Sequence, residues 1–163
     1  KEGETYSADV IISTIPWMEF AKITGMPQEL KEKIGHLKYS SVQTAYFPDN
    51  LDTEAQWVYY PDPELSYHRI LVRHNFCNGS KGYWTECNST RVDETTESTF
   101  QYMNQYAYPL NTIGKPEIMK ELLEWAKTRR VYGLGRWGEH QHYNSDLVVE
   151  LALKMAEELN SAQ

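Results

Sequence analysis

The chain has 163 residues, of which 40% are hydrophobic and 13% aromatic, so it is long enough to bury a globular core. A formal net charge of -7 argues against nucleic acid or an anionic membrane as a partner of the whole surface, although a local basic pocket for a phosphate stays open. The sequence has neither an apolar run of membrane-spanning length nor a signal peptide, so we expect a cytoplasmic protein without a membrane span.

Two further features concern the setting of the chain. It begins at Lys1 in a polar run without a methionine, so we expect it to be a piece of a longer protein. Cys77 and Cys87 are expected to be free thiols, because nothing else in the sequence signals secretion. A disulfide across a hairpin is the alternative.

The first forty residues predict one strand and two helices. Residues 8–16 are a β-branched apolar run stopped by proline, which predicts a buried strand of a parallel sheet. A helical turn follows over residues 17–23. Pro27 then begins a helix that places Leu30, Ile34 and Leu37 on one face.

The middle of the chain predicts an antiparallel meander, because short β-prone runs alternate with tight turns. The predicted strands cover residues 41–47, 56–60, 67–74 and 82–87. Residues 88–99 are polar and predict a loop or the capped start of a helix over residues 97–104. Residues 106–109 are expected to be extended, since a residue before proline avoids the helical region.

The last third predicts two helices around a short strand. Pro116 begins the first, with Ile118, Leu122 and Trp125 on one face. A strand at Val131 leads into glycines. The final helix covers residues 145–159, and its apolar positions repeat every four residues at Leu147, Leu151, Met155 and Leu159.

Residues 132–146 form the stretch with the clearest functional signal. Glycines at its start let backbone approach a ligand closely, and Arg136 follows them among aromatic and imidazole side chains. Asn144, Ser145 and Asp146 then open a helix, whose free N–H groups suit an anion or an electron-rich ring. This pattern predicts a site for a bulky, partly anionic cofactor.

Other interpretations of this stretch are weaker. His140 and His142 beside Glu139 are metal-ligand types, but the spacing places no third ligand, so we assign no metal. Residues 133–138 imitate a dinucleotide fingerprint, yet the long polar segment before the helix gives the wrong geometry. Elsewhere, Arg69 lies between aromatics on a predicted strand. It either meets an anion such as a phosphate on an inner sheet face or is solvated on an outer face.

Together these segments resemble the C-terminal half of the UDP-galactopyranose mutase-like flavoproteins, within the amine oxidase and protoporphyrinogen oxidase group. Residues 135–146 resemble that family's closing flavin motif and carry the most specific similarity. Weaker similarities, in chain order, lie at residues 8–16, at 59–63 followed by 67–70, and at 106–110.

The resemblance implies an α+β fragment of an α/β flavoprotein. Residues 1–16 and 131–163 would be pieces of the FAD domain, and residues 39–110 would be the antiparallel sheet of the substrate domain. The whole chain, residues 1–163, would be the C-terminal, substrate-side portion of the enzyme. Its partners would be the N-terminal FAD-binding part of its own chain and a nucleotide sugar, with a homodimer as a further possibility.

The resemblance also implies binding roles for residues, while the catalytic residues stay unknown. FAD in the intact protein would be contacted by Gly135, Arg136, Asn144, Ser145 and Asp146. The nucleotide sugar would be contacted by Arg69, Tyr108 and His142. The sequence departs from the family at Ser40, where an arginine is usual, and at His142, Asn144 and Ser145, where Tyr, Asp and Met are usual.

The implied function is mutase chemistry on a nucleotide sugar in the synthesis of lipopolysaccharide or another cell-surface polysaccharide. In that family the reduced flavin attacks the sugar and the protein mainly positions it. Two alternatives remain open. One is a flavin oxidoreductase similar to amine or protoporphyrinogen oxidases, and the other is a non-catalytic domain that binds a partner.

Overall fold

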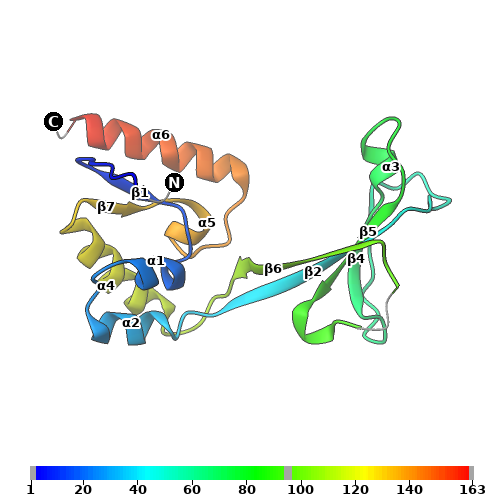
Figure 1. The fold of residues 1–163 in the computed structure, drawn as a ribbon, viewed down its shortest axis with the longest axis horizontal. Helices are drawn as coiled ribbons and strands as arrows, with labels where there is room; N and C mark the ends of the chain where they lie inside the picture. Colours follow the sequence, from blue (N-terminus) through cyan, green and yellow to red (C-terminus); the bar gives the residue numbers. More distant parts are fainter. Residues whose placement is uncertain (1–2, 94–96, 162–163) are drawn as a thin grey trace. The chain divides into compact units, whose positions relative to one another are not determined.

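The computed structural model describes residues 3–93 and 97–161. The chain divides into two compact units (Figure 1). We call the unit Lys1–Tyr39 with Tyr108–Gln163 the helical unit, and the unit Ser40–Ala107 the sheet unit. The fold is mixed α+β, with an antiparallel sheet plus helices, which confirms the predicted class.

The helical unit has a core built by three helices. Its elements are β1 Ile11–Ser13, α1 Trp17–Ile23, α2 Gln28–Ile34, α4 Lys115–Lys127, β7 Val131–Gly133, α5 Gly135–Gly138 and α6 Ser145–Ser161. The predicted face of Leu30, Ile34 and Leu37 is buried in this core. From α4, Met119, Leu122 and Ala126 are buried, with Ile118 and Trp125 packed beside them, so the predicted helices are confirmed here.

The starts of α1 and α2 follow from two prolines. Pro16 and Pro27 occupy the N-cap positions, where a fixed φ suits entry into a helix and no N–H is lost from a hydrogen bond. Trp17 follows Pro16 at once and is fully buried. Its Nε1 donates to the Gly138 carbonyl over 2.8 Å, which ties α1 to α5.

The prediction of a buried strand over residues 8–16 is wrong in extent and in burial. Only Ile11–Ser13 is a strand, and Ile11 and Ile12 are 50% and 47% exposed. Its parallel orientation is confirmed, since β1 pairs with β7 in parallel register. Parallel strands are usually covered on both faces. The described residues supply a sheet of only these two strands, so the isoleucines stay exposed.

Helix α6 also leaves apolar side chains uncovered. None of its described residues is buried, and Val149 and Leu153 are 60% and 62% exposed. It contacts α5 (Figure 1). Val148 lies beside Gly135. The repeat of apolar residues therefore predicted the helix correctly, but it does not indicate a buried face within this chain. Among the described helices, none is both long and apolar enough to cross a membrane.

The sheet unit contains five strands in the order β3-β4-β5-β2-β6. Their bounds are β2 Tyr39–Phe47, β3 Trp57–Tyr59, β4 Tyr67–Leu71, β5 Tyr83–Asn88 and β6 Phe100–Pro109, with the short helix α3 Arg73–Phe76 and the 3-10 turn η1 Ser89–Arg91 between them. The predicted meander describes β3, β4 and β5. It fails for β2, which lies between β5 and β6, so long connections rather than hairpins join the remaining strands.

Two predictions in this unit need correction. Residues 97–104 are not a helix, because Phe100–Pro109 is a strand. Pairing with β2 overrides the local preference, and side chains reinforce it: the Ser41 hydroxyl donates to the Gln105 carbonyl over 2.6 Å. The strand predicted over residues 67–74 ends at Leu71, and α3 follows. Cys77 and Cys87 are free thiols, as expected, the first exposed and the second buried.

Three backbones meet closely where β1, β7 and α5 join. A β-carbon on Gly133 would lie 2.0 Å from the Gly138 carbonyl oxygen, and one on Gly138 would lie 2.3 Å from the Ser13 carbonyl oxygen. Both distances are far below van der Waals contact, and both neighbours are backbone atoms. The glycines are therefore required for the approach of these segments.

We predict that Gly138→Ala lowers the free energy of unfolding by about 1–3 kcal/mol or more, because the added methyl group forces these backbones apart. Urea denaturation followed by circular dichroism measures the change. Gly25→Ala is the matched control, since nothing lies within 4 Å of its β-carbon, and it should stay within about 0.5 kcal/mol of the parent. If Gly138→Ala were as stable as Gly25→Ala, glycine would not be required at position 138.

Candidate functional site

A cavity of about 490 Å³ opens in the helical unit where the two parallel strands end. Thr14 follows β1, and Leu134 and Gly135 follow β7. The full lining is Thr14, Leu134, Gly135, Arg136, Trp137, Tyr143, Ser145, Val148 and Val149. Ligands of open α/β sheets bind outside the carboxyl ends of the strands, which is where this cavity lies.

The turn that forms the cavity wall depends on Gly135. Its φ of +76° lies in the left-handed region that favours glycine, and a β-carbon there would contact Val148 at 3.4 Å. The Glu139 carboxylate accepts a hydrogen bond from the Gly135 N–H over 3.3 Å. Burial raises the pKa of Glu139, although this hydrogen bond partly opposes the rise. Gly135 therefore lets α5 begin directly after Leu134, one residue beyond the end of β7.

Arg136 gathers the polar part of the site. Its guanidinium donates to the Tyr143 carbonyl over 3.0 Å and lies 5.3 Å from the centroid of the Tyr108 ring. The His142 ring lies 5.0 Å from the Tyr108 ring on centroids. Three residues predicted from the resemblance thus lie together in the helical unit: Arg136 and His142 from residues 135–146, and Tyr108 from the end of β6. Arg136 is held at the cavity with its charge partly shared by a carbonyl and a ring.

The start of α6 supplies the other predicted contacts. The Asn144 carbonyl accepts the Val148 N–H over 3.2 Å, which begins the helix, and Ser145 lines the cavity. Asn144, Ser145 and Asp146 are exposed. A helix of this length has free N–H groups and the positive end of its dipole at this point. The Asp146 carboxylate in the first turn favours the helix but takes up part of that potential.

Two buried polar residues hold the segment between α5 and α6, a role that the sequence did not predict. His140 is fully buried with a positive φ of 50°, and its Nε2 lies 3.0 Å from the Lys38 carbonyl oxygen. Lys115 is 5% exposed, and its ammonium donates to the His140 carbonyl over 3.1 Å and to Gln141 Oε1 over 2.9 Å. Burial lowers the pKa of both groups.

The sequence places Lys115 directly before Pro116, the expected helix start, and so gives no signal for its burial. In the structure it is the first residue of α4, where the macrodipole disfavours a lysine, so its presence there needs another reason. The three oxygens around its ammonium, the third being Asn111 Oδ1, supply that reason. The sequence likewise gave no indication that His140 is buried.

The charge of the cavity suits an anionic or electron-rich group. Among its lining residues there is a guanidinium and no carboxylate, and most of the remaining lining is apolar or aromatic. A planar, aromatic, partly anionic ligand matches such a surface. In the described part of the chain, no cluster of three or more His, Cys, Asp or Glu side chains is placed to hold a metal ion.

Arg69 lies in the other unit and meets an anion from its own sheet. Its Nε donates to Glu86 over 2.8 Å, and a second guanidinium nitrogen also bonds that carboxylate. Tyr59 accepts a further hydrogen bond over 3.1 Å. Arg69 therefore does meet an anion on its sheet face, but that anion is the Glu86 carboxylate of the neighbouring strand. Its charge is paired without a phosphate.

Comparisons with known proteins address the fold. No protein-family model and no curated protein matches this sequence. The structure is similar to that of reduced UDP-galactopyranose mutase, with a TM-score of 0.68 and 21% identity over 83% of this chain and 37% of that chain. It is also similar to "Putative protoporphyrinogen oxidase" from Exiguobacterium sp. 255-15, with a TM-score of 0.59 and 14% identity over 96% of this chain and 42% of that chain.

These similarities confirm the predicted fold relationship. The chain spans less than half the length of either structure. At such identities the comparison concerns fold, and the roles of individual residues remain predictions.

His140 makes stability depend on pH. Burial, and to a smaller extent the charge of Lys115, keeps the pKa of the folded imidazole below its ordinary value of 6.5. Below about pH 6.5 the imidazole of the unfolded chain binds a proton, while the buried imidazole of the folded chain does not. The contribution of neutral His140 to stability is therefore complete above that pH and is lost as the pH falls toward the pKa of the folded state.

We predict that the free energy of unfolding falls more between about pH 7.5 and about pH 5.5 in the parent chain than in His140→Gln. Urea titrations at the two pH values measure the difference. Exposed His36→Gln serves as the control and should keep the parental pH dependence. If His140→Gln kept it as well, His140 would not be the group responsible.

Proposed function

We propose that this chain is the C-terminal, substrate-side portion of a FAD-dependent enzyme similar to UDP-galactopyranose mutase, acting on a nucleotide sugar in cell-surface polysaccharide synthesis. The observation that carries the proposal is the cavity at the carboxyl ends of β1 and β7. It gathers Gly135, Arg136 and Ser145 from the segment that resembles the closing flavin motif. The similarity in fold to reduced UDP-galactopyranose mutase supports it.

The residues around the cavity fit a flavin. Gly135 removes the β-carbon where a ring would pass close to backbone, and Trp137, Val148 and Val149 offer apolar surface. Arg136 and the start of α6 offer positive potential to the electron-rich end of the ring system. In the proposed enzyme the flavin, when bound, supplies the nucleophilic nitrogen for exchange at the sugar.

This chain's own residues would bind and orient. Arg136 would contact FAD, and the Tyr143 carbonyl would keep its guanidinium aimed at the cavity. Tyr108 and His142, whose rings contact each other, would line the nucleotide-sugar side. Arg69 would meet the diphosphate, sharing its guanidinium between that group and Glu86.

The uncovered surface of the helical unit supports a missing partner from the same protein. A two-stranded parallel sheet with exposed Ile11 and Ile12 is expected to continue into further strands. The exposed apolar residues of α6 add to this surface. We propose that the N-terminal FAD-binding part of the intact protein covers it, and that the helical unit completes the FAD domain while the sheet unit belongs to the substrate domain.

A second candidate is a flavin oxidoreductase of the protoporphyrinogen oxidase kind. The similarity to the Exiguobacterium structure, which covers 96% of this chain, favours it. Saturation-transfer NMR of the intact protein with UDP and UDP-galactose separates the two candidates. The mutase-like proposal expects saturation of the uridine and galactose protons. Absence of transfer from both ligands would contradict it and leave the oxidoreductase or a non-catalytic domain.

We predict that Arg136→Ala in the intact protein weakens FAD binding by about tenfold or more, because a charged hydrogen-bond donor at the cavity is lost. Flavin fluorescence during titration with FAD measures the dissociation constant. Lys120→Ala is the control, because it removes one exposed positive charge from the same unit. If Arg136→Ala bound FAD as tightly as the parent, the cavity at Arg136 would not be part of the flavin site.

We predict that Arg69→Ala raises the Michaelis constant for the nucleotide sugar by about tenfold. The substitution also leaves the partly buried Glu86 carboxylate unpaired, at a cost of about 2 kcal/mol in stability. The double variant Arg69→Leu/Glu86→Leu restores stability and separates the two effects. A normal Michaelis constant in the double variant would show that Arg69 serves only its sheet.

A further inference from the structure

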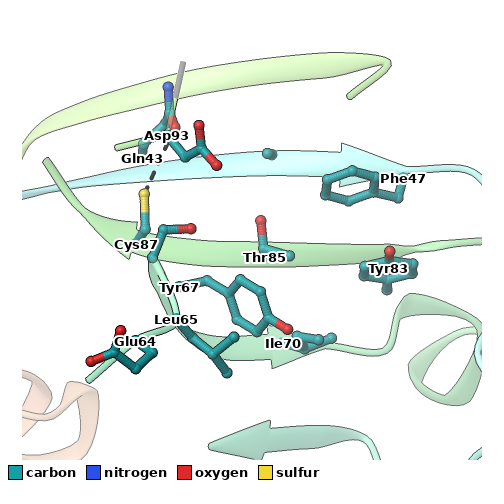
Figure 2. A pocket seen from close by; sticks show the side chains of 12 residues that line it. Gln43, Phe47, Glu64, Leu65, Tyr67, Ile70, Tyr83, Thr85, Cys87 and Asp93 are labelled. Carbon is teal, nitrogen blue, oxygen red and sulfur yellow. Dashed lines mark hydrogen bonds between the residues drawn. The ribbon is translucent and has the colours of Figure 1, made fainter. Parts of the chain in front are cut away.

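The sheet unit holds a second cavity, against one face of its sheet (Figure 2). Its volume of about 380 Å³ is within the range of small-molecule sites. The lining residues come from β2, β4, β5 and two adjoining segments: Gln43, Ala45, Phe47, Glu64, Leu65, Ser66, Tyr67, Ile70, Tyr83, Thr85, Cys87 and Asp93. No function described above uses this cavity.

An irregularity in β4 aims Tyr67 into the cavity. Tyr67 pairs with Cys87 and Arg69 with Glu86, so the register shifts between them and His68 is the extra residue. Without the bulge, Tyr67 and Arg69 would point to the same face, because side chains alternate along a strand. With it, Tyr67 and Ile70 line the cavity while Arg69 and Glu86 occupy the opposite face. Within the sheet unit, the cavity is therefore separate from Arg69 and Glu86.

The wall of the cavity is anchored rather than loose. The Arg91 guanidinium donates to the Leu65 carbonyl over 2.7 Å and also to the Pro63 carbonyl. The Asn88 side chain caps the turn that carries Arg91, accepting the Thr90 N–H over 3.0 Å. The segment of Glu64 and Leu65 is thus held beside the sheet.

The cavity has one acidic end and one aromatic end. Figure 2 shows Glu64 and Asp93 at the end of Cys87, and Phe47 with Tyr83 at the other. The Phe47 and Tyr83 rings stack with centroids 4.9 Å apart and planes 13° apart. Tyr83 and Cys87 are four positions apart on β5, about 13 Å of strand, with Thr85 between them.

The lining includes two carboxylates and no lysine, arginine or histidine. Such a surface repels phosphates and carboxylates and attracts cations, and aromatic faces add to the attraction. Burial, and to a smaller extent the charges of Tyr67, Asp49 and Tyr60, raises the pKa of Tyr83.

We propose that this cavity binds an organic cation: an ammonium or guanidinium group on an apolar or aromatic stem. The cationic group meets Glu64 and Asp93, and the stem lies along Tyr67 and Thr85 toward the Phe47–Tyr83 pair. Two sources share this chemistry, a free amine and the basic side chain of a peptide. The proposal does not depend on the flavin or on the nucleotide sugar.

Four probes titrated into the 163-residue chain test it by NMR chemical-shift changes. Tyramine represents a free aromatic amine, and Nα-acetyl-lysinamide represents a basic side chain. Tyrosol and 4-hydroxyphenylacetate keep the phenol of tyramine but replace its ammonium by a hydroxyl or a carboxylate. We expect shifts at Tyr67, Tyr83 and Thr85 with one or both cationic probes, and the stronger of the two identifies the source.

Glu64→Gln provides the matched variant, because Glu64 is exposed and its substitution is therefore expected to leave the fold intact. It should weaken binding of the cationic probe by about fivefold, while Glu54→Gln, an exposed carboxylate outside the lining, should not. The proposal is overturned if neither cation binds, if tyrosol binds as tightly as tyramine, or if Glu64→Gln binds like the parent.

Discussion

The contact among the backbones of Ser13, Gly133 and Gly138 determines where the candidate site forms. A β-carbon at either glycine would overlap a carbonyl oxygen, so β1, β7 and α5 meet only because both positions lack a side chain. Buried Trp17 holds the same point by donating to the Gly138 carbonyl. With α5 fixed against the strand ends, Arg136 can only be at the mouth of the cavity, and the chain must then pass through the buried segment around His140 to reach α6.

The helical unit combines a polar turn that is held by buried hydrogen bonds with an apolar surface that is exposed to solvent. Lys115 and His140 are buried with hydrogen-bond partners for the ammonium and for one imidazole nitrogen, so the segment leading to α6 is fixed from within. In contrast, Ile12 on β1 and Leu153 on α6, in the same unit, are exposed. A chain that fixes one wall of a cavity and leaves apolar strands and a helix uncovered is what half of a larger cofactor domain would present. The proposed function accounts for both features.

Much of the fold could be predicted from local signals, because prolines and apolar periodicity act within a few residues. They predicted α1, α2 and α4, and the glycines with the helix start predicted the site at residues 132–146.

The predictions that failed have long-range causes. Residues 100–104 belong to a strand because β2 pairs with it, and β1 is exposed because no third strand lies beside it among the described residues. The pairing of Arg69 with Glu86 depends on a bulge that alternation cannot show. Burial of His140 depends on Lys38, more than a hundred residues away.

The most direct test of the account is the flavin content of two purified proteins after gel filtration, the intact protein and the 163-residue chain. Absorbance in the visible flavin band, calibrated by FAD released on denaturation, gives the content. The account predicts that the intact protein keeps stoichiometric FAD and that the chain alone loses it, since the chain supplies one side of the site. An intact protein without flavin, or a chain that stays stoichiometrically yellow by itself, would contradict the account.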